Sequence, residues 1–240
     1  MESLVDGTGH ELTLKDLTTA QDIVFTPQRL VIAGLTGRHE SENQRHIHEM
    51  KAAGIRLESS SPVFFDLPAS LVQQTDVLVV PSLESSGEVE PVLFCTPAGW
   101  FVGVGSDHTA RDMARESVVG GKTACCKPVG RDVIPAGLMI ENWDQFELHS
   151  SVEGKDYQKS SLGEMQPLNE IVDAYQLESK SSTDGLVMFL GTVPMLSGEL
   201  RYGQDFLARI AGGGITLSCR YDVRVSQSSV STLPEPPAPA

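Results

Sequence analysis

Basic residues are scarce in this sequence. It has 18 Lys and Arg against 32 Asp and Glu, so the formal net charge of the 240 residues is −14 at pH 7. A chain with this excess of negative charge is repelled by phosphate backbones and by anionic lipid surfaces. The composition therefore argues against nucleic acid as a partner.

Long apolar runs are missing as well. Hydrophobic residues make up 40% of the chain, which is typical of a globular protein, but no run approaches the roughly 18 residues of a membrane-spanning helix. The first 15 residues carry Glu2, Asp6 and Glu11 and lack the basic start and apolar middle of a secretory signal. We therefore expect a cytoplasmic protein with no membrane partner.

Paired cysteine motifs are also absent. The four cysteines are Cys95, Cys125, Cys126 and Cys219, and no two of them have CxxC spacing. Two are adjacent, which is a geometry that rarely makes an ordinary disulfide. We expect reduced thiols that act as small buried hydrophobic side chains, and no zinc site.

Short β-rich runs fill the middle of the chain, separated by Gly, Pro, Ser and Asp. The predicted strands are residues 29–34, 76–80, 88–94, 100–105, 185–191, 205–210 and 215–225. One helix is predicted over residues 42–53, with Ser41 as N-cap and Gly54 at its C-terminal end. The sequence therefore predicts a mainly β domain with a few helices.

Three regions of different composition suggest the domain organisation. Residues 1–28 are polar and are expected to form an N-terminal extension. Residues 29–226 carry the predicted strands and form the expected catalytic domain. Residues 227–240 end in the proline-rich stretch LPEPPAPA, which is unsuited to helix or central strand and is expected to be disordered.

The most informative segment reads SGEVEPVLF over residues 86–94. Side chains alternate between the two faces of a strand, so Glu88 and Glu90 would share one face about 6 to 7 Å apart. Carboxylates are almost never buried unpaired, and two of them on one strand face beside apolar residues need a cation. The alternative is a solvated outer face of an antiparallel sheet.

A third acid ends the next predicted strand. The segment WFVGVGSDHTARD leads a glycine-punctuated strand into Asp107, where backbone and ligand can approach closely. Three carboxylate oxygen ligands, with water as the remaining ligands, are typical of a site for a hard divalent cation such as Mg²⁺ or Mn²⁺, with Ca²⁺ as a further option. Alternatively, Asp107 is the N-cap of a helix that starts near Ala110.

Two further features could contribute to such a site. Residues 120–123 read GGKT, but a phosphate-binding loop needs glycine at position 116, where this chain has Glu116. What remains is Lys122 in a glycine-flanked turn, directed into a site or solvated at the surface. On the predicted helix, His46 and Glu49 share a face as a base and an orienting acid, or as ordinary exposed side chains.

Several segments occur together in a fixed order. They are HIHEM from His46, SPVFFDLPASLV from Ser61, GEVE from Gly87, VGSDHTARD from Val104, GGK from Gly120, YQKSSLGEM from Tyr157, and MFLGTVP from Met188 followed by LRYGQDF. This order resembles the fumarylacetoacetate hydrolase superfamily, whose motifs read approximately HxxEM, PxxFxKPxSxL, ExE, GNDVSARD, GKSFD, RQxGNTSDM and TGTPxGVG. The resemblance spans residues 30–224 and is to an uncharacterised branch of that superfamily, marked here by SSGEVEPVLF and GVGSDHT. It implies an α+β, mainly β fold: a mixed β-roll with a few helices.

The resemblance also implies roles for individual residues. The metal ligands would be Glu88, Glu90 and Asp107. The catalytic Lys122 would stabilise developing negative charge. The catalytic pair His46 and Glu49 would activate water or move protons. The substrate contacts would be Thr192, Gln158, Arg111 and His108. For Arg111 the alternative is a structural role, and for His108 the alternatives are to orient a metal ligand or to act as an additional base.

The implied function is a Mg²⁺- or Mn²⁺-dependent hydrolase that cleaves a carbon–carbon bond in a small 2-oxo acid or 1,3-dicarbonyl substrate, acting as a homodimer. Two alternatives stay open. One is a lyase or isomerase of the same superfamily, such as an oxo-acid decarboxylase, hydratase or keto–enol tautomerase. The other is a catalytically silent protein that binds metal and ligand.

Overall fold

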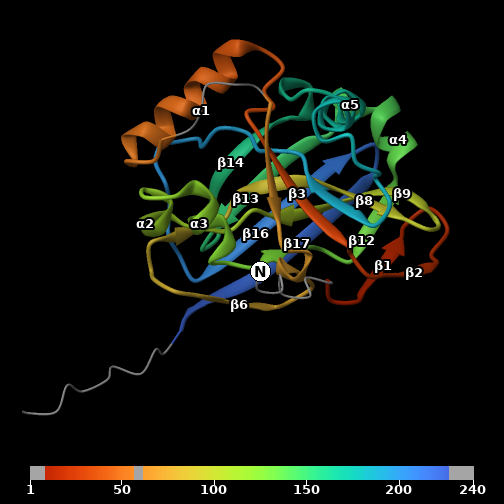
Figure 1. Cartoon of the computed structure of the whole chain (residues 1–240), viewed down its shortest axis with the longest axis horizontal. Helices are drawn as coiled ribbons and strands as arrows, with labels where there is room; N and C mark the ends of the chain where they lie inside the picture. Colours follow the sequence, from red (N-terminus) through yellow and green to blue (C-terminus); the bar gives the residue numbers. More distant parts are fainter. Residues whose placement is uncertain (1–8, 57–61, 227–240) are drawn as a thin grey trace, which may run out of the picture.

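The computed structural model describes residues 9–56 and 62–226, and its fold is built on two packed β-sheets (Figure 1). The larger sheet has eight strands in the order β2 (Asp22–Phe25), β1 (Leu12–Asp16), β12 (Asp132–Pro135), β9 (Gly99–Ser106), β8 (Val89–Thr96), β15 (Leu186–Phe189), β3 (Arg29–Gly34) and β4 (Val63–Leu67). The smaller sheet has five, in the order β14 (Lys155–Ser161), β13 (Glu147–Val152), β16 (Asp205–Gly212), β17 (Ile215–Val225) and β6 (Val77–Val80). Both sheets mix parallel and antiparallel neighbours.

Short elements complete the fold. Two two-stranded ladders pair β7 (Ser85–Ser86) with β10 (Thr109–Ala110) and β5 (Val72–Gln73) with β11 (Lys127–Pro128). The helices are α1 (Glu40–Ala52), α2 (Arg111–Ala114), α3 (Val118–Thr123), α4 (Ala136–Glu141) and α5 (Leu168–Ser179), with 3-10 turns η1 (Ala69–Leu71), η2 (Trp143–Gln145) and η3 (Leu162–Glu164). In Figure 1, α1 lies at one end of the molecule with α2 and α3 below it.

The hairpin of β8 and β9 forms the centre of the larger sheet, and every residue of β8 is buried. Its side chains alternate between two hydrophobic cores. Val89 and Leu93 face the core between the two sheets, whereas Val92 and Phe94 belong to a second core. Because both faces of β8 are covered, acidic residues at its start are carried into the interior.

Glycines in β9 make room for the second core. A Cβ atom at Gly105 would lie 2.9 Å from the ring of Phe189 and 3.0 Å from Val92, and one at Gly103 would lie 3.0 Å from Phe94. Such contacts are closer than packed carbon atoms allow. The two glycines therefore let large side chains of the neighbouring strands fill this face of β9.

The mainly β prediction and all seven predicted strands are confirmed, as β3, β6, β8, β9, β15, β16 and β17. The prediction of reduced cysteines that act as small buried side chains is also supported, since all four cysteines are free and three of them are buried. The predicted proline-rich tail lies outside the described residues. Among the helices of the described chain, none is both long enough and apolar enough to cross a membrane.

The predicted helix is confirmed as α1, but its boundary was wrong. Ser41 is not the N-cap: the helix begins at Glu40 and its N-cap is His39, whose backbone N–H donates to the Glu42 carboxylate at 2.7 Å. The acid at the third helical position thus fixes an earlier start. Gly54 follows the helix with φ of +81°, as expected of a glycine that ends one.

The predicted turn around Lys122 was also wrong, because these residues form the short helix α3. Ser117 is its N-cap, and its hydroxyl accepts a hydrogen bond from the Gly120 N–H at 3.0 Å. Lys122 therefore projects from a helix and not from a loop.

Residues 12–25 of the predicted N-terminal extension form β1 and β2 at one edge of the larger sheet. β1 pairs in parallel with β12, and Leu12, Leu14 and Phe25 are buried in the second core. The separation of residues 1–28 from the rest stays a prediction, and it can be tested through the stability of this edge.

We expect Leu14→Ala to lower the free energy of unfolding of the whole chain by about 3 kcal/mol, since it leaves a cavity in a closely packed core. Leu14 is fully buried, whereas Leu17, which follows β1, is 39% exposed. Urea unfolding followed by fluorescence and circular dichroism would measure the effect, with Leu17→Ala as the matched control losing less than about 1 kcal/mol. A separate early transition confined to the N-terminal residues would instead show that they form an independent extension.

Candidate metal centre and cleft

Three carboxylates converge at the open end of the β8–β9 hairpin. One oxygen from each of Glu88, Glu90 and Asp107 can be chosen so that all three lie within 4.8 Å of one another. The antiparallel register sets Val89 opposite Ser106, and the Asp107 N–H donates to the Glu88 carbonyl at 3.0 Å. All three side chains are buried, which excludes the alternative of a solvated acidic face. Asp107 is also not a helix N-cap, because that position before α2 belongs to Ala110.

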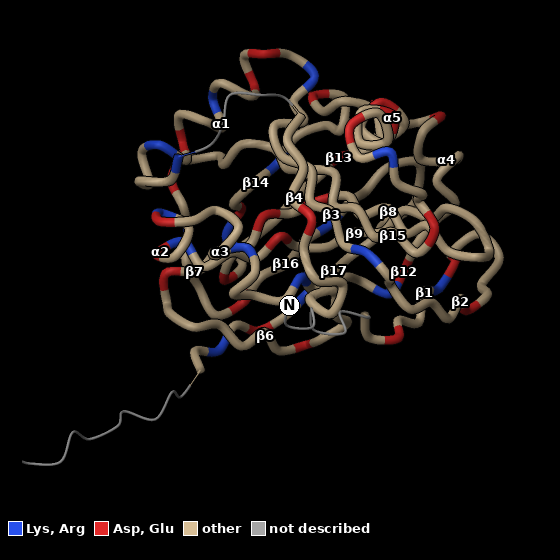
Figure 2. The backbone as a smooth tube through the Cα atoms, in the orientation of Figure 1, with Lys and Arg blue, Asp and Glu red and all other residues tan. Residues whose placement is uncertain are grey.

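Three cationic side chains surround these acids. Lys122 and Lys127 both pair with Asp107, the second with Nζ 2.9 Å from Oδ1, and Arg111 pairs with Glu88 at 3.1 Å. With all groups ionised, the charges of this buried cluster sum to zero. Figure 2 shows acidic and basic positions side by side around α2, α3 and β7, where the cluster lies.

The two lysines decide the ionisation of Asp107. Burial alone would raise the pKa of this carboxyl, but the ammonium groups of Lys122 and Lys127 hold it well below its usual value. Asp107 is therefore an ionised carboxylate throughout the physiological range.

Glu90 has a different environment. Among the described residues it has no ion-pair partner, and its Oε2 accepts a hydrogen bond from the Gly191 N–H at 2.8 Å. Burial and the charge of Asp107 raise the pKa of Glu90 well above its ordinary value. The hydrogen bond requires a glycine, because Gly191 has φ of +91° and a Cβ there would lie 2.0 Å from the Thr36 hydroxyl.

These residues fit a hard divalent cation. The donor set consists only of carboxylate oxygens, which Mg²⁺ and Mn²⁺ prefer. A divalent cation would supply positive charge beside Glu90, the acid that lacks a cationic partner. Within the described residues, this trio is the only group of His, Cys, Asp and Glu side chains spaced to hold a metal ion.

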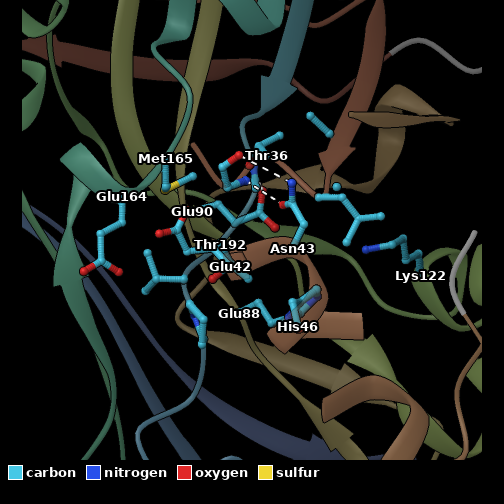
Figure 3. A pocket seen from close by; sticks show the side chains of 17 residues that line it. Thr36, Glu42, Asn43, His46, Glu88, Glu90, Lys122, Glu164, Met165 and Thr192 are labelled. Atoms are coloured by element: carbon cyan, nitrogen blue, oxygen red, sulfur yellow. Dashed lines mark hydrogen bonds between the residues drawn. The ribbon is translucent and has the colours of Figure 1, made fainter. Parts of the chain in front are cut away.

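A cleft opens beside the acids. Its lining includes Glu88, Glu90, Lys122, His46 and Thr192, so half of the ten predicted site residues share one space (Figure 3). His46 and Lys122 are brought to two of the predicted metal ligands from two separate helices, α1 and α3.

The predicted base His46 and its predicted orienting acid Glu49 lie on α1. The Nδ1 atom of His46 is 3.7 Å from Oε2 of Glu49, and Glu49 is buried with no hydrogen bond to that oxygen in the described chain. Opposite, the ammonium of Lys122 lies 5.3 Å from the centre of the Phe65 ring. An aromatic face in this position shields the charge from water and stabilises it.

Thr192 lines the cleft, but Gln158 does not. The buried Gln158 amide makes four hydrogen bonds: its oxygen accepts from the Val89 N–H and the Ser150 hydroxyl at 3.0 Å each, and its nitrogen donates to the Thr192 hydroxyl and the Val193 carbonyl at 2.8 and 2.7 Å. The amide has no capacity left for a substrate. Its contacts instead fix Thr192 against the start of β8.

Arg111 and His108 lie behind the cleft. Arg111 is 3% exposed, and besides Glu88 it donates to the Ser86 hydroxyl at 2.8 Å. His108 is 2% exposed, with Nδ1 2.9 Å from the hydroxyl of Tyr221, and burial lowers its pKa to about 3. It is therefore neutral. Direct substrate contact by either residue stays a prediction, and both are in place to support the acidic cluster.

Sequence reasoning missed Lys127. Its side chain is fully buried, and its ammonium donates to the carbonyls of His108 and Lys122 at 2.6 and 2.5 Å in addition to Asp107. Nothing in the local sequence KPV marks a buried lysine. Its position follows from the pairing of β11 with β5, which joins residues far apart in the chain.

A sequence family described as "Protein of unknown function (DUF2848)" matches residues 33–221. No curated protein matches the chain.

Solved structures with a similar fold come from enzymes. Fumarylpyruvate hydrolase from Pseudomonas aeruginosa, in complex with Mn²⁺ and pyruvate, superimposes with a TM-score of 0.62 at 19% identity over 90% of this chain and 97% of its own. A yeast fumarylacetoacetate hydrolase family protein gives 0.60 at 15% identity over 83% and 93%. A 2-keto-3-deoxyarabinonate dehydratase gives 0.54 at 17% identity over 84% and 75%. The predicted β-roll is thereby confirmed: the fold is that of fumarylacetoacetate hydrolase family proteins.

We expect Lys127→Met to lower the free energy of unfolding by about 3 kcal/mol, because it leaves the buried Asp107 charge with one of its two ammonium partners and leaves the carbonyls of His108 and Lys122 without this donor. The matched control is Lys159→Met. Lys159 pairs with Glu147 at 3.5 Å with both side chains about half exposed, so its loss should cost less than about 1 kcal/mol. Urea unfolding of both variants measures the difference, and equal losses would contradict the structural role assigned to Lys127.

Proposed function

This chain belongs to the DUF2848 family of proteins of unknown function, and we propose that it is a divalent-metal-dependent hydrolase that cleaves a carbon–carbon bond in a small 2-oxo acid or 1,3-dicarbonyl substrate. The observation that carries the proposal is the buried carboxylate trio, of which Glu88 and Glu90 line one cleft together with a lysine and a histidine, Lys122 and His46. A fold neighbour, fumarylpyruvate hydrolase, was solved with Mn²⁺ and pyruvate, which supports the same class of ligands here.

Glu88, Glu90 and Asp107 would hold the cation, Mg²⁺ or Mn²⁺. When bound, a divalent cation polarises the oxygens of an oxo acid and favours negative charge on them. The ammonium of Lys122 lines the same cleft and adds a second, preorganised positive charge where this negative charge develops. Thr192 would contact the substrate carboxylate or oxyanion, held in position by Gln158.

His46 would activate water. Glu49 lies on the Nδ1 side of its ring, which orients the imidazole and leaves Nε2 to accept a proton. The hydroxide that results adds to the distal carbonyl carbon. The carbon–carbon bond to the oxo-acid half then breaks, and that half takes up a proton, so one water is consumed and the products are an oxo acid and a carboxylic acid.

A lyase or isomerase of the same superfamily is the second candidate, because a dehydratase shares the fold. The same acids, lysine and histidine would serve proton transfer without attack by water. Product analysis separates the two: acylpyruvates give pyruvate and a carboxylic acid in the hydrolase, whereas a decarboxylase releases CO₂. A protein that only binds metal and ligand would give neither. The homodimer and the cytoplasmic location stay predictions.

Metal binding is the first test. At a hundredfold excess over its dissociation constant, Mn²⁺ or Mg²⁺ should stabilise the chain by about 2.7 kcal/mol and raise its Tm by about 5 to 10 °C. Chelation should reverse the shift. In Asp107→Asn the shift should vanish, while Asp173→Asn, a change of the same kind at an exposed position of α5, should keep it. An unchanged shift in Asp107→Asn would place the metal elsewhere.

Catalysis is the second test. On an acylpyruvate substrate, His46→Gln and Lys122→Met should each lower kcat by about a hundredfold or more, the usual loss for a general base or a charge-stabilising donor. His48→Gln, an exposed position on the same helix, is the control for the first change. Stopped-flow absorbance of the enolised substrate measures the rates. If His46→Gln kept its activity, the base would have to be another group.

A further inference from the structure

With a divalent cation bound, the cleft would carry opposite charges at its two sides. The buried cluster sums to zero when its acids are ionised, so a bound divalent cation would give it a net charge of +2. Away from this cluster the cleft is lined by two more carboxylates, Glu42 and Glu164. In Figure 3, Glu164 and Lys122 lie at opposite sides, with Glu90 and Thr192 between them.

Glu164 has an unpaired charge. It ends η3, it is exposed, and among the described residues its carboxylate has no hydrogen-bond or ion-pair partner. Glu42 accepts a hydrogen bond from the N-terminus of α1 and still carries its negative charge.

Neither acid has an ion-pair partner among the described residues, although Glu42 is attracted electrostatically by Arg38 outside the cleft lining. Lys122 is the only Lys or Arg that lines the cleft. The neighbouring Arg38 is committed elsewhere, with two hydrogen bonds to Asp144 at 2.6 and 3.1 Å and one to the Met165 carbonyl. The sequence of the residues outside the described ranges contains no Lys, Arg or His.

From this polarity we infer that the substrate is a 2-oxo acid with a single carboxylate, bound at the metal side, and with a far end that is a hydrogen-bond donor and not a second carboxylate. The inference rests on the proposed function and specifies its substrate class. The cationic side attracts the oxo-acid group, whereas Glu164 repels an anion and accepts a hydrogen bond from a donor. Met165, Val193 and Pro194 also line the cleft and give an aliphatic chain between the two ends an apolar wall.

Three five-carbon 2-oxo acids that differ only at the far carbon provide the test: 2-oxopentanoate, 5-hydroxy-2-oxopentanoate and 2-oxopentanedioate. Their binding to the full chain with Mn²⁺ is measured by calorimetry. We expect 2-oxopentanedioate to bind about tenfold more weakly than 2-oxopentanoate, because like charges face each other. The hydroxy acid should bind at least as tightly as 2-oxopentanoate.

Glu164→Gln should reduce the tenfold difference in affinity between 2-oxopentanoate and 2-oxopentanedioate to about threefold or less, since it removes the repulsion and keeps the size of the side chain. Glu178→Gln is the matched control, an exposed acid on α5 away from the cleft, and should leave this difference unchanged. Thermal unfolding without ligand verifies that both variants are folded.

The outcomes separate this inference from the proposed function. Tight binding of 2-oxopentanedioate, or a difference in affinity that Glu164→Gln does not change, would overturn the inference alone. Selective binding of the monocarboxylates without turnover of any acylpyruvate would support it and overturn the proposed reaction. If Mn²⁺ promoted binding of none of the three, both would fail.

Discussion

The burial of Asp107 between two ammonium groups is the interaction on which the site depends. An ionised carboxylate that is removed from water is strongly destabilising unless it is paired and hydrogen-bonded. Here Lys122 and Lys127 supply the charge, and Lys127 also joins the carbonyls of His108 and Lys122. One buried lysine thereby connects the end of β9, which carries Asp107, to the helix α3, which carries Lys122.

Much of the fold was predictable because its central strands are strongly apolar. The runs that became β8, β9, β15 and β17 are rich in β-branched and aromatic residues and bounded by turn residues. β1, β2, β12 and β14 were missed because they are short or polar, and tertiary pairing decides the conformation of such segments. The start of α1 was also misplaced, because the Glu42 carboxylate accepts a hydrogen bond from the backbone of His39 and the helix therefore begins before Ser41.

The acids of the site were predictable for a related physical reason. Two carboxylates with strand spacing next to buried residues already demand a cation, and an antiparallel hairpin brings the end of the following strand beside them. The sequence does not reveal which cationic side chains pair with these carboxylates. Lys127 comes from a segment without a local signal. Gln158 matches a family motif, yet its amide is used entirely within the protein.

The residues of the candidate site lie on two kinds of structural element, strands on the one hand and helices or turns on the other. The candidate metal ligands lie within β8 or directly beside β8 and β9, in buried positions where few side-chain movements are available. The candidate proton-transfer and charge-stabilising groups lie on the helices α1 and α3, and Glu164 lies in the turn η3. Changes in α1 or in the turn would alter groups around the cleft without removing the ammonium partners of Asp107. The fold occurs both in a hydrolase and in a dehydratase, so the side chains around the cleft, and not the fold, must identify the reaction of this chain.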